Sequence, residues 1–117
     1  MLIGLLNVTL AFANCESGKL ITTKAGTFCK SDIALNWWSA SNWCIKNGRT
    51  LATMYDACPN WDGNQGDTCP EFPDTDGARV WTATAYSTGY ASTIRDGFVE
   101  YGYQVGERYR TYQALCR

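Results

Sequence analysis

Six cysteines constrain the fold of this chain more than any other feature of its sequence. They stand at positions Cys15, Cys29, Cys44, Cys58, Cys69 and Cys116. An even number of cysteines in a chain of 117 residues, long enough for one domain, is typical of an exported protein held together by disulfides. Six cysteines allow many pairings, and proximity along the chain favours Cys15–Cys29 and Cys58–Cys69. The remaining pair, Cys44–Cys116, would then join the middle of the chain to its end.

The spacing of the cysteines argues against a metal site. Structural zinc sites use Cys-x-x-Cys pairs or mixtures of cysteine and histidine, whereas even the closest two cysteines, Cys58 and Cys69, are far apart in the sequence. The chain contains no histidine, which removes the commonest general base and Ser-His-Asp catalysis. The sequence therefore predicts disulfides, and neither a metal nor another cofactor.

Residues 1–13 form an apolar segment without a charged side chain. The segment ends in Ala11-Phe12-Ala13, which matches a signal-peptidase site, so we expect a signal peptide at 1–13 and a single domain at 14–117. Because no Lys or Arg precedes the segment, it is alternatively the remnant of a longer N-terminal hydrophobic helix. Both interpretations predict a secreted, periplasmic or cell-surface protein. A span takes roughly 20 apolar residues, so the mature domain is expected to have no stable membrane span.

Local patterns predict the helices. The main helix is expected over residues 37–47, with Asn36 as its N-cap and Gly48 just after its end. A second, short helical turn is expected at residues 55–58. Four tryptophans are expected in the core: Trp37, Trp38, Trp43 and Trp81.

Extended segments surround this helical region. Residues 14–30 are expected to form a hairpin or an irregular clasp, and Asp96-Gly97 is the strongest hairpin signal in the sequence. Strand patterns occur at residues 80–84, 91–95, 98–105 and 109–117. Residues 59–78, rich in Asp, Gly and Pro, form a long acidic loop of a length that favours a function. We therefore predict an α+β fold, with one main and one short helix packed on an antiparallel sheet.

This order of elements resembles a C-type lectin-like domain. The residues that carry the resemblance are Trp37-Trp38-Ser39-Ala40-Ser41-Asn42-Trp43-Cys44, Val80-Trp81-Thr82-Ala83-Thr84 and Ala114-Leu115-Cys116-Arg117. Residues 80–117 are also similar to the bacterial Fibrobacter-type major paralogous domain. The resemblance implies that the helix cysteine pairs with the cysteine of the last strand. It does not by itself imply a ligand, because one fold hosts many functions.

The chain departs from calcium-dependent members of that family. They carry Glu-Pro-Asn or Gln-Pro-Asp in the long loop and Trp-Asn-Asp in the next strand, whereas this chain has Cys58-Pro59-Asn60 and no Trp-Asn-Asp. Calcium takes about six to eight oxygen ligands, and Asp62, Asn64 and Asp67 are not in EF-hand order. We therefore expect a solvated turn and calcium-independent function.

The leading hypothesis is an extracellular recognition or adhesion module that binds a protein or glycan through the long loop and the Tyr-rich strands. Its expected contact residues are Trp61, Asp62, Asn64, Asp67, Tyr86, Tyr90, Tyr101, Tyr103, Arg108 and Tyr109. A net charge of −1, with Lys and Arg scattered along the chain, gives no basic stripe for a nucleic acid.

Two other classes of function remain open. The chain is alternatively the structural head of a pilin-like or surface-array subunit, which would self-assemble. An enzyme is not expected, although a two-carboxylate glycosidase could draw on Asp62, Asp67, Glu71 or Asp74, and related oxidases of similar fold use free cysteines.

Overall fold

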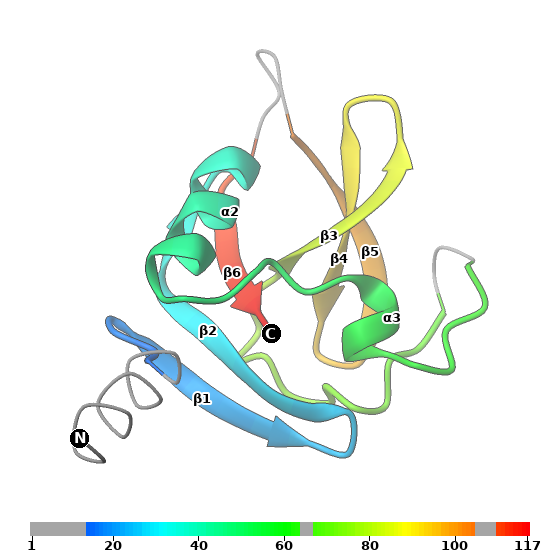
Figure 1. The fold of residues 1–117 in the computed structure, drawn as a ribbon. Coiled ribbons are helices and arrows are strands. Elements are labelled where there is room, and N and C mark those ends of the chain that lie inside the picture. The colour runs from blue at the N-terminus through cyan, green and yellow to red at the C-terminus, as the bar shows by residue number, and fades with distance from the viewer. Residues whose placement is uncertain (1–13, 64–66, 105–109) are drawn as a thin grey trace.

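The computed structural model describes residues 14–63, 67–104 and 110–117. In these ranges the chain forms a six-stranded sheet with one long and one short helix (Figure 1). The elements are β1 Gly18–Thr23, β2 Gly26–Leu35, α2 Trp37–Lys46, α3 Met54–Ala57, β3 Val80–Ser87, β4 Tyr90–Arg95, β5 Phe98–Tyr103 and β6 Tyr112–Cys116. The predicted signal peptide at residues 1–13 lies outside the described residues. Neither described helix is long and apolar enough to cross a membrane.

The main helix, α2, forms with the caps that the sequence predicts. The side-chain oxygen of Asn36 accepts a hydrogen bond from a backbone N–H of the first turn. At the other end, Gly48 has a φ of 70°. Its N–H donates to the Ile45 carbonyl at 2.9 Å, and the Arg49 N–H donates to the Cys44 carbonyl at 2.9 Å. These two bonds form a Schellman motif, which requires the positive φ that glycine adopts readily.

The sheet has the order β1-β2-β6-β3-β4-β5, and it is mixed, so the prediction of an antiparallel sheet is wrong in one place. β6 pairs antiparallel with β2 but parallel with β3. Cys116 in β6 is bonded to Cys44 in α2 and lies opposite Cys29 in β2, so the last strand is held in the middle of the sheet. β6 therefore lies between β2 and β3, and not beside β5, which precedes it in the sequence.

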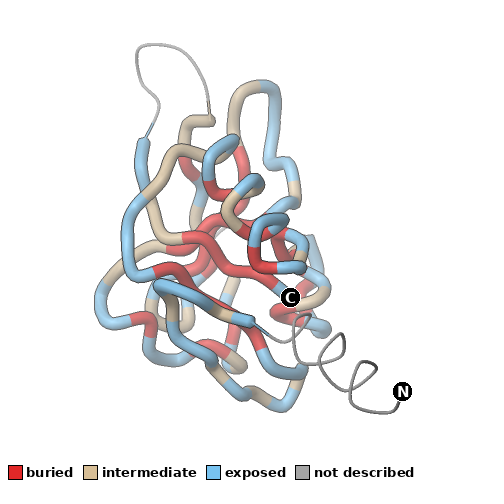
Figure 2. Tube along the Cα trace, turned by 60° about the vertical axis from the view of Figure 1, so that its left-hand side comes forward, coloured by how far each residue is buried: buried red, intermediate tan, exposed pale blue. Residues whose placement is uncertain are grey.

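Two groups of buried side chains lie on opposite faces of the sheet. Val80 packs with residues of α3 and the long loop, whereas the adjacent Trp81 packs with residues of α2. Successive side chains of a strand point to opposite faces. Helix α2 therefore covers one face, and α3 with the long loop covers the other. Figure 2 shows the buried segments gathered in the middle of the molecule.

The tryptophans differ in how far the fold buries them. Trp81 is fully buried, and its indole N–H donates to a carbonyl of β2 at 2.7 Å. Trp37 and Trp43 are half-buried. The prediction that Trp38 is a core residue is wrong, because its side chain is 60% exposed. Helix α2 turns only one face to the sheet, the face that carries Cys44, and Trp38 lies off that face.

Three disulfides link these elements, in the pairs that proximity along the chain favours: Cys15–Cys29, Cys44–Cys116 and Cys58–Cys69. The first closes the N-terminal hairpin, and the third closes the start of the long loop. The second joins residues 72 positions apart. Three disulfides in one small domain indicate an oxidising compartment outside the cytoplasm.

The β4–β5 hairpin turns at Asp96-Gly97, as predicted. Both residues have positive φ, 45° and 84°, as a type I′ turn requires. The long loop, residues 59–78, runs against this hairpin, since the Asp67 carbonyl accepts a hydrogen bond from the Val99 N–H at 2.8 Å. The loop thus covers the outer edge of β5 near the turn.

Removing the long-range disulfide should cost more stability than removing a local one. The double substitution Cys44→Ala/Cys116→Ala should lower the free energy of unfolding by about 4 kcal/mol, and Cys58→Ala/Cys69→Ala, which opens a loop of separation 11, by about 3 kcal/mol. Urea denaturation measures both values. A larger loss from the Cys58–Cys69 pair would contradict this ranking.

Gly102 in β5 is a second sensitive position. A Cβ atom there would lie 2.5 Å from Cε2 of Tyr112 and 3.0 Å from the Trp81 ring. Gly102→Ala should therefore lower the free energy of unfolding by about 2 kcal/mol, as overpacking does. Ser87→Ala, at an exposed position of β3, is the control and should change it by less than about 0.5 kcal/mol. Equal unfolding midpoints for the two variants would refute the close packing.

Candidate functional site

Four tyrosines from three strands form one group, which we call the tyrosine cluster: Tyr86, Tyr90, Tyr101 and Tyr103. The rings of Tyr86 and Tyr101 are stacked with centroids 5.0 Å apart, and the Tyr90 ring lies 5.2 Å from Tyr101 and 4.4 Å from Tyr103. The register explains this contact, since Tyr90 in β4 lies opposite Tyr103 in β5. Tyr86 joins them because β3 continues to Ser87, beyond its predicted end.

The tyrosine cluster lies at the end of the β4–β5 hairpin remote from its Asp96-Gly97 turn. Tyr86 and Tyr101 are 48% and 43% exposed, and Tyr90 and Tyr103 are half-buried. Mutual ring contacts restrict the rotamers of all four side chains. The cluster is therefore an aromatic surface with little conformational entropy left to lose on contact.

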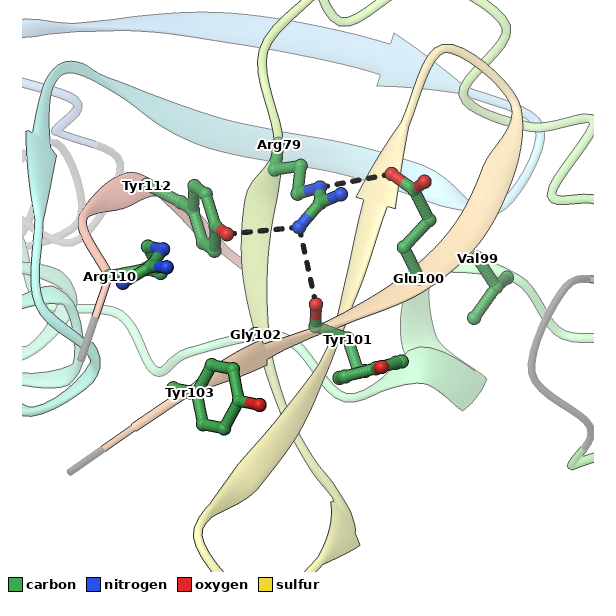
Figure 3. A pocket seen from close by; sticks show the side chains of 8 residues that line it. All are labelled: Arg79, Val99, Glu100, Tyr101, Gly102, Tyr103, Arg110 and Tyr112. Carbon is green, nitrogen blue, oxygen red and sulfur yellow. Dashed lines mark hydrogen bonds and ion pairs between the residues drawn. The ribbon is translucent and has the colours of Figure 1, made fainter. Parts of the chain in front are cut away.

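A hollow of about 440 Å³ adjoins the cluster, and we call it the arginine–tyrosine hollow. Figure 3 shows the residues that line it: Arg79, Val99, Glu100, Tyr101, Gly102, Tyr103, Arg110 and Tyr112. Tyr101 and Tyr103 belong to both features. The hollow lies at β5, and Arg79, Arg110 and Tyr112 line it from outside this strand.

Arg79 organises the charge of the hollow. Its Nε donates to the Glu100 carboxylate at 3.0 Å, and its Nη1 donates to the Tyr112 hydroxyl at 3.0 Å and to the Tyr101 carbonyl at 3.3 Å (Figure 3). The other Glu100 oxygen pairs with Arg95 at 3.1 Å. Three partners in three directions hold the guanidinium plane in one orientation.

Each of two guanidinium groups also lies near an aromatic ring. The guanidinium carbon of Arg79 is 5.4 Å from the centre of the Tyr112 ring, and that of Arg110 is 6.0 Å from the centre of the Tyr103 ring. These separations are within the range of cation–π attraction. The hollow thus combines positive charge with aromatic surface.

The long loop contributes less aromatic surface than the sequence predicts. Trp61, an expected contact residue, is 9% exposed and packs in the core with Met54 and Phe72. Its ring lies 5.4 Å from that of Tyr55. Trp61 therefore offers little surface for the predicted contact: the Cys58–Cys69 bond closes this part of the loop, and the indole packs in the core group that holds residues of α3.

Two acidic residues of the loop lie side by side. A hydrogen bond with the Asp62 carboxyl raises the pKa of Asp67 above its ordinary value of 3.8, and desolvation and the Asp62 charge act in the same direction. Two carboxylates offer fewer oxygens than the roughly six to eight that calcium takes. Of the other expected contact residues, Asn64, Arg108 and Tyr109 lie outside the described residues.

Only one further group in the described ranges has the spacing of a metal site: Cys58, Cys69 and Glu71. Both of its sulfurs are joined in a disulfide, so they offer no thiolate for a metal ion. All six cysteines are bonded in this way.

Sequence analysis did not single out the charged residues of the hollow. Arg79 and Glu100 are 21 positions apart, and no local pattern brings them together. Tyr112 lies in the predicted strand at residues 109–117, and no local pattern relates it to Arg79. Nothing but the folded sheet, with β6 beside β3, assembles these side chains.

The fold and the site define a small disulfide-linked α+β domain with an exposed tyrosine cluster beside an arginine-containing hollow. Comparison of the chain with protein-family models, with curated proteins and with solved structures finds no match. Its function must therefore be argued from its own residues.

The Asp96 carboxylate holds the long loop to the hairpin. It accepts hydrogen bonds from the Thr75 N–H at 2.7 Å, the Thr75 hydroxyl at 3.1 Å and the Gly77 N–H at 3.2 Å. Bonds from the backbone of Thr75 and Gly77 lower the pKa of Asp96 below its ordinary value of 3.8. The carboxylate therefore stabilises the fold when it is ionised.

This shift predicts an acid dependence of stability. Because the pKa of Asp96 is lowered in the folded state, its carboxylate adds to the free energy of unfolding. This stabilisation is fully present above the ordinary value of 3.8 and is lost as the pH falls through the lowered value. Asp96→Asn should be less stable than the native protein at pH 7, and the difference should shrink below about pH 4. Urea denaturation from pH 7 to pH 2 measures it. Asp32→Asn, an exposed change of the same charge, is the control, and a pH-independent difference for Asp96→Asn would contradict the role.

Proposed function

We propose that this chain is a C-type lectin-like domain that acts outside the cytoplasm as a calcium-independent recognition or adhesion module. Its contact surface is the tyrosine cluster together with the neighbouring hollow and the border of the long loop. The observation that carries the proposal is the contact among four partly exposed tyrosine rings from β3, β4 and β5.

The arrangement of the elements supports the lectin-like assignment. The helix cysteine, Cys44, is bonded to Cys116 in the last strand. The strand that follows the N-terminal hairpin turn, β2, pairs with the C-terminal strand, β6. A long loop, residues 59–78, separates the helices from the C-terminal strands. The cysteine pair is the feature that the sequence resemblance implies, and the long loop belongs to the order of elements on which that resemblance rests.

The chemistry of the cluster supports a role in recognition. Tyrosine offers a large ring and a hydroxyl group on a side chain with few rotatable bonds, so it binds at low entropic cost. An exposed group of such rings on a soluble domain is commonly a contact site. The strands hold the rings in fixed positions, and the partner is expected to be a protein or a glycan.

The loop borders this surface without supplying its centre. Asp67 lies beside β5 through its bond to Val99, two positions before Tyr101. Asp62 and Asp67 therefore stand at the rim, where charged residues tune orientation more than affinity. The alternative of a pilin-like head depends on residues 1–13, which are not described.

An array of glycans and extracellular proteins tests the proposal. The purified native domain should bind at least one ligand, and Tyr86→Ala/Tyr101→Ala should weaken that binding by at least about tenfold, because central aromatic residues dominate contact energy. Tyr55→Ala, which removes an exposed tyrosine on α3, is the matched control and should bind normally.

Three results would count against the proposal. They are the absence of any ligand, undiminished binding by the double variant, and loss of binding in the presence of a calcium chelator. The last result would contradict only the calcium-independent part. Retention of all three disulfides in each variant shows that the fold is intact.

A further inference from the structure

We infer that two copies of this chain pair through the outer edge of β1, antiparallel and about a two-fold axis at Leu20, so that one sheet runs through both copies. The inference goes beyond the proposed function, since it concerns self-association at the edge of the sheet remote from the tyrosine cluster. β1 and β5 are the two edge strands, and β1 runs along the lower margin of the molecule in Figure 1.

The hydrogen bonds of the β1–β2 hairpin show which backbone groups of β1 point outward. Gly18 lies opposite Ser31 in the register, and the neighbouring bond runs from the Asp32 N–H to the Ser17 carbonyl at 2.9 Å. Gly18 and Ser31 are therefore a pair that exchanges no hydrogen bond with each other. Such pairs alternate along an antiparallel ladder, and their N–H and C=O groups turn away from the partner strand. The outward residues of β1 are Gly18, Leu20 and Thr22.

This edge of the sheet is open. Among the described strands, only β2 pairs with β1, and the register of the pair is unbroken over the six residues of β1. In the described parts of the chain, no backbone hydrogen bond reaches the outward groups of β1. The strand contains no proline. A regular edge of this kind is a template on which another strand can pair.

The other edge of the sheet is engaged within the chain. On β5, the Val99 N–H donates to the Asp67 carbonyl at 2.8 Å, and the Tyr103 carbonyl accepts from the Arg110 N–H at 3.1 Å. The outer side of β5 is therefore a poor template for a further strand. A chain with one open edge pairs once and then stops, which gives a closed dimer and not a filament.

Antiparallel pairing of β1 with itself satisfies the open edge. Leu20 is the middle one of the outward residues, so a two-fold axis there sets Leu20 against Leu20 of the second copy, and Gly18 against Thr22 of the second copy. Each of these pairs exchanges both of its backbone hydrogen bonds. The Leu20 side chain is 51% exposed in the single chain. In the dimer the two Leu20 side chains lie on the same face of the joined sheet and cover one another.

The charges at the two ends of β1 favour a second copy as the partner. Glu16 precedes the strand and Lys24 follows it, and both side chains are exposed. Neither forms an ion pair with another described residue. Antiparallel pairing about Leu20 brings Glu16 of each copy to the end of the contact where Lys24 of the other copy lies. Opposite charges therefore support this register, whereas parallel pairing would set like charges together.

The dimer carries its two tyrosine clusters at opposite ends, because β4 and β5 lie furthest from β1 in the sheet. A multivalent ligand can then engage both clusters, which raises the overall affinity without any new contact. The contact along β1 is short, so we expect a dissociation constant of the dimer in the micromolar range.

Sedimentation equilibrium of the purified protein without ligand tests the inference. As the concentration rises from about 1 μM to about 1 mM, the mass should rise from one chain to two and no further. Leu20→Lys, which sets two ammonium groups side by side, should weaken the dimer by at least about tenfold. Ile45→Lys adds the same charge at an exposed apolar position of α2 and should dimerise like the native protein.

A charge exchange tests the antiparallel register itself. Glu16→Lys and Lys24→Glu should each weaken the dimer by about threefold at low salt, because each sets like charges together at both ends of the contact. The double variant Glu16→Lys/Lys24→Glu restores opposite charges and should recover the native dissociation constant.

Four results would overturn the inference. They are a single chain at the highest concentration, native dimerisation of Leu20→Lys, an equal loss in Ile45→Lys, and additive losses in the charge-exchange variant. Thermal unfolding of each variant checks that the fold is retained. The proposed function stands apart from these results, since ligand binding by the tyrosine cluster is measured separately on the array.

Discussion

The bond between Cys44 and Cys116 is the interaction on which the arrangement of this domain depends. It joins the helix that precedes the long loop to the strand that ends the chain. The Cys15–Cys29 bond lies beside it, because Cys29 and Cys116 are partners in the β2–β6 register. Four sulfurs therefore meet in the core under α2. A domain of this size buries a limited apolar area, so such covalent closure supplies a large share of its stability.

This closure also determines which surface is left for binding. Because β6 is held between β2 and β3, the β4–β5 hairpin becomes the far edge of the sheet. The Cys58–Cys69 bond and the Asp96 carboxylate hold the long loop against one end of that hairpin. At the opposite end of the hairpin, Tyr90 and Tyr103 pair across the strands.

The tyrosine cluster and the hollow offer different kinds of interaction to a partner. The cluster offers contact area at low entropic cost, which supports affinity for many partners. The hollow adds a directional charge, because Glu100 and the Tyr101 carbonyl orient Arg79 while Arg95 offsets the Glu100 carboxylate. Packing also limits what the site tolerates, since Gly102 lies directly beneath the Tyr112 ring. The cluster thus supports the affinity for a partner, whereas the oriented charge of the hollow supports selectivity between partners.

Local sequence determined the features that depend on neighbours in the chain: the caps of α2, the Asp96-Gly97 turn, the extent of the long loop and, through proximity, the cysteine pairs. Only the tertiary structure decided the parallel β3–β6 pair, the exposure of Trp38 and the burial of Trp61. The same holds for the meeting of Arg79 with Glu100. Caps and turns are formed by hydrogen bonds between residues close in the sequence. Burial and ion pairing depend on which distant part of the chain covers a side chain, and the periodicity of the sequence does not identify that part.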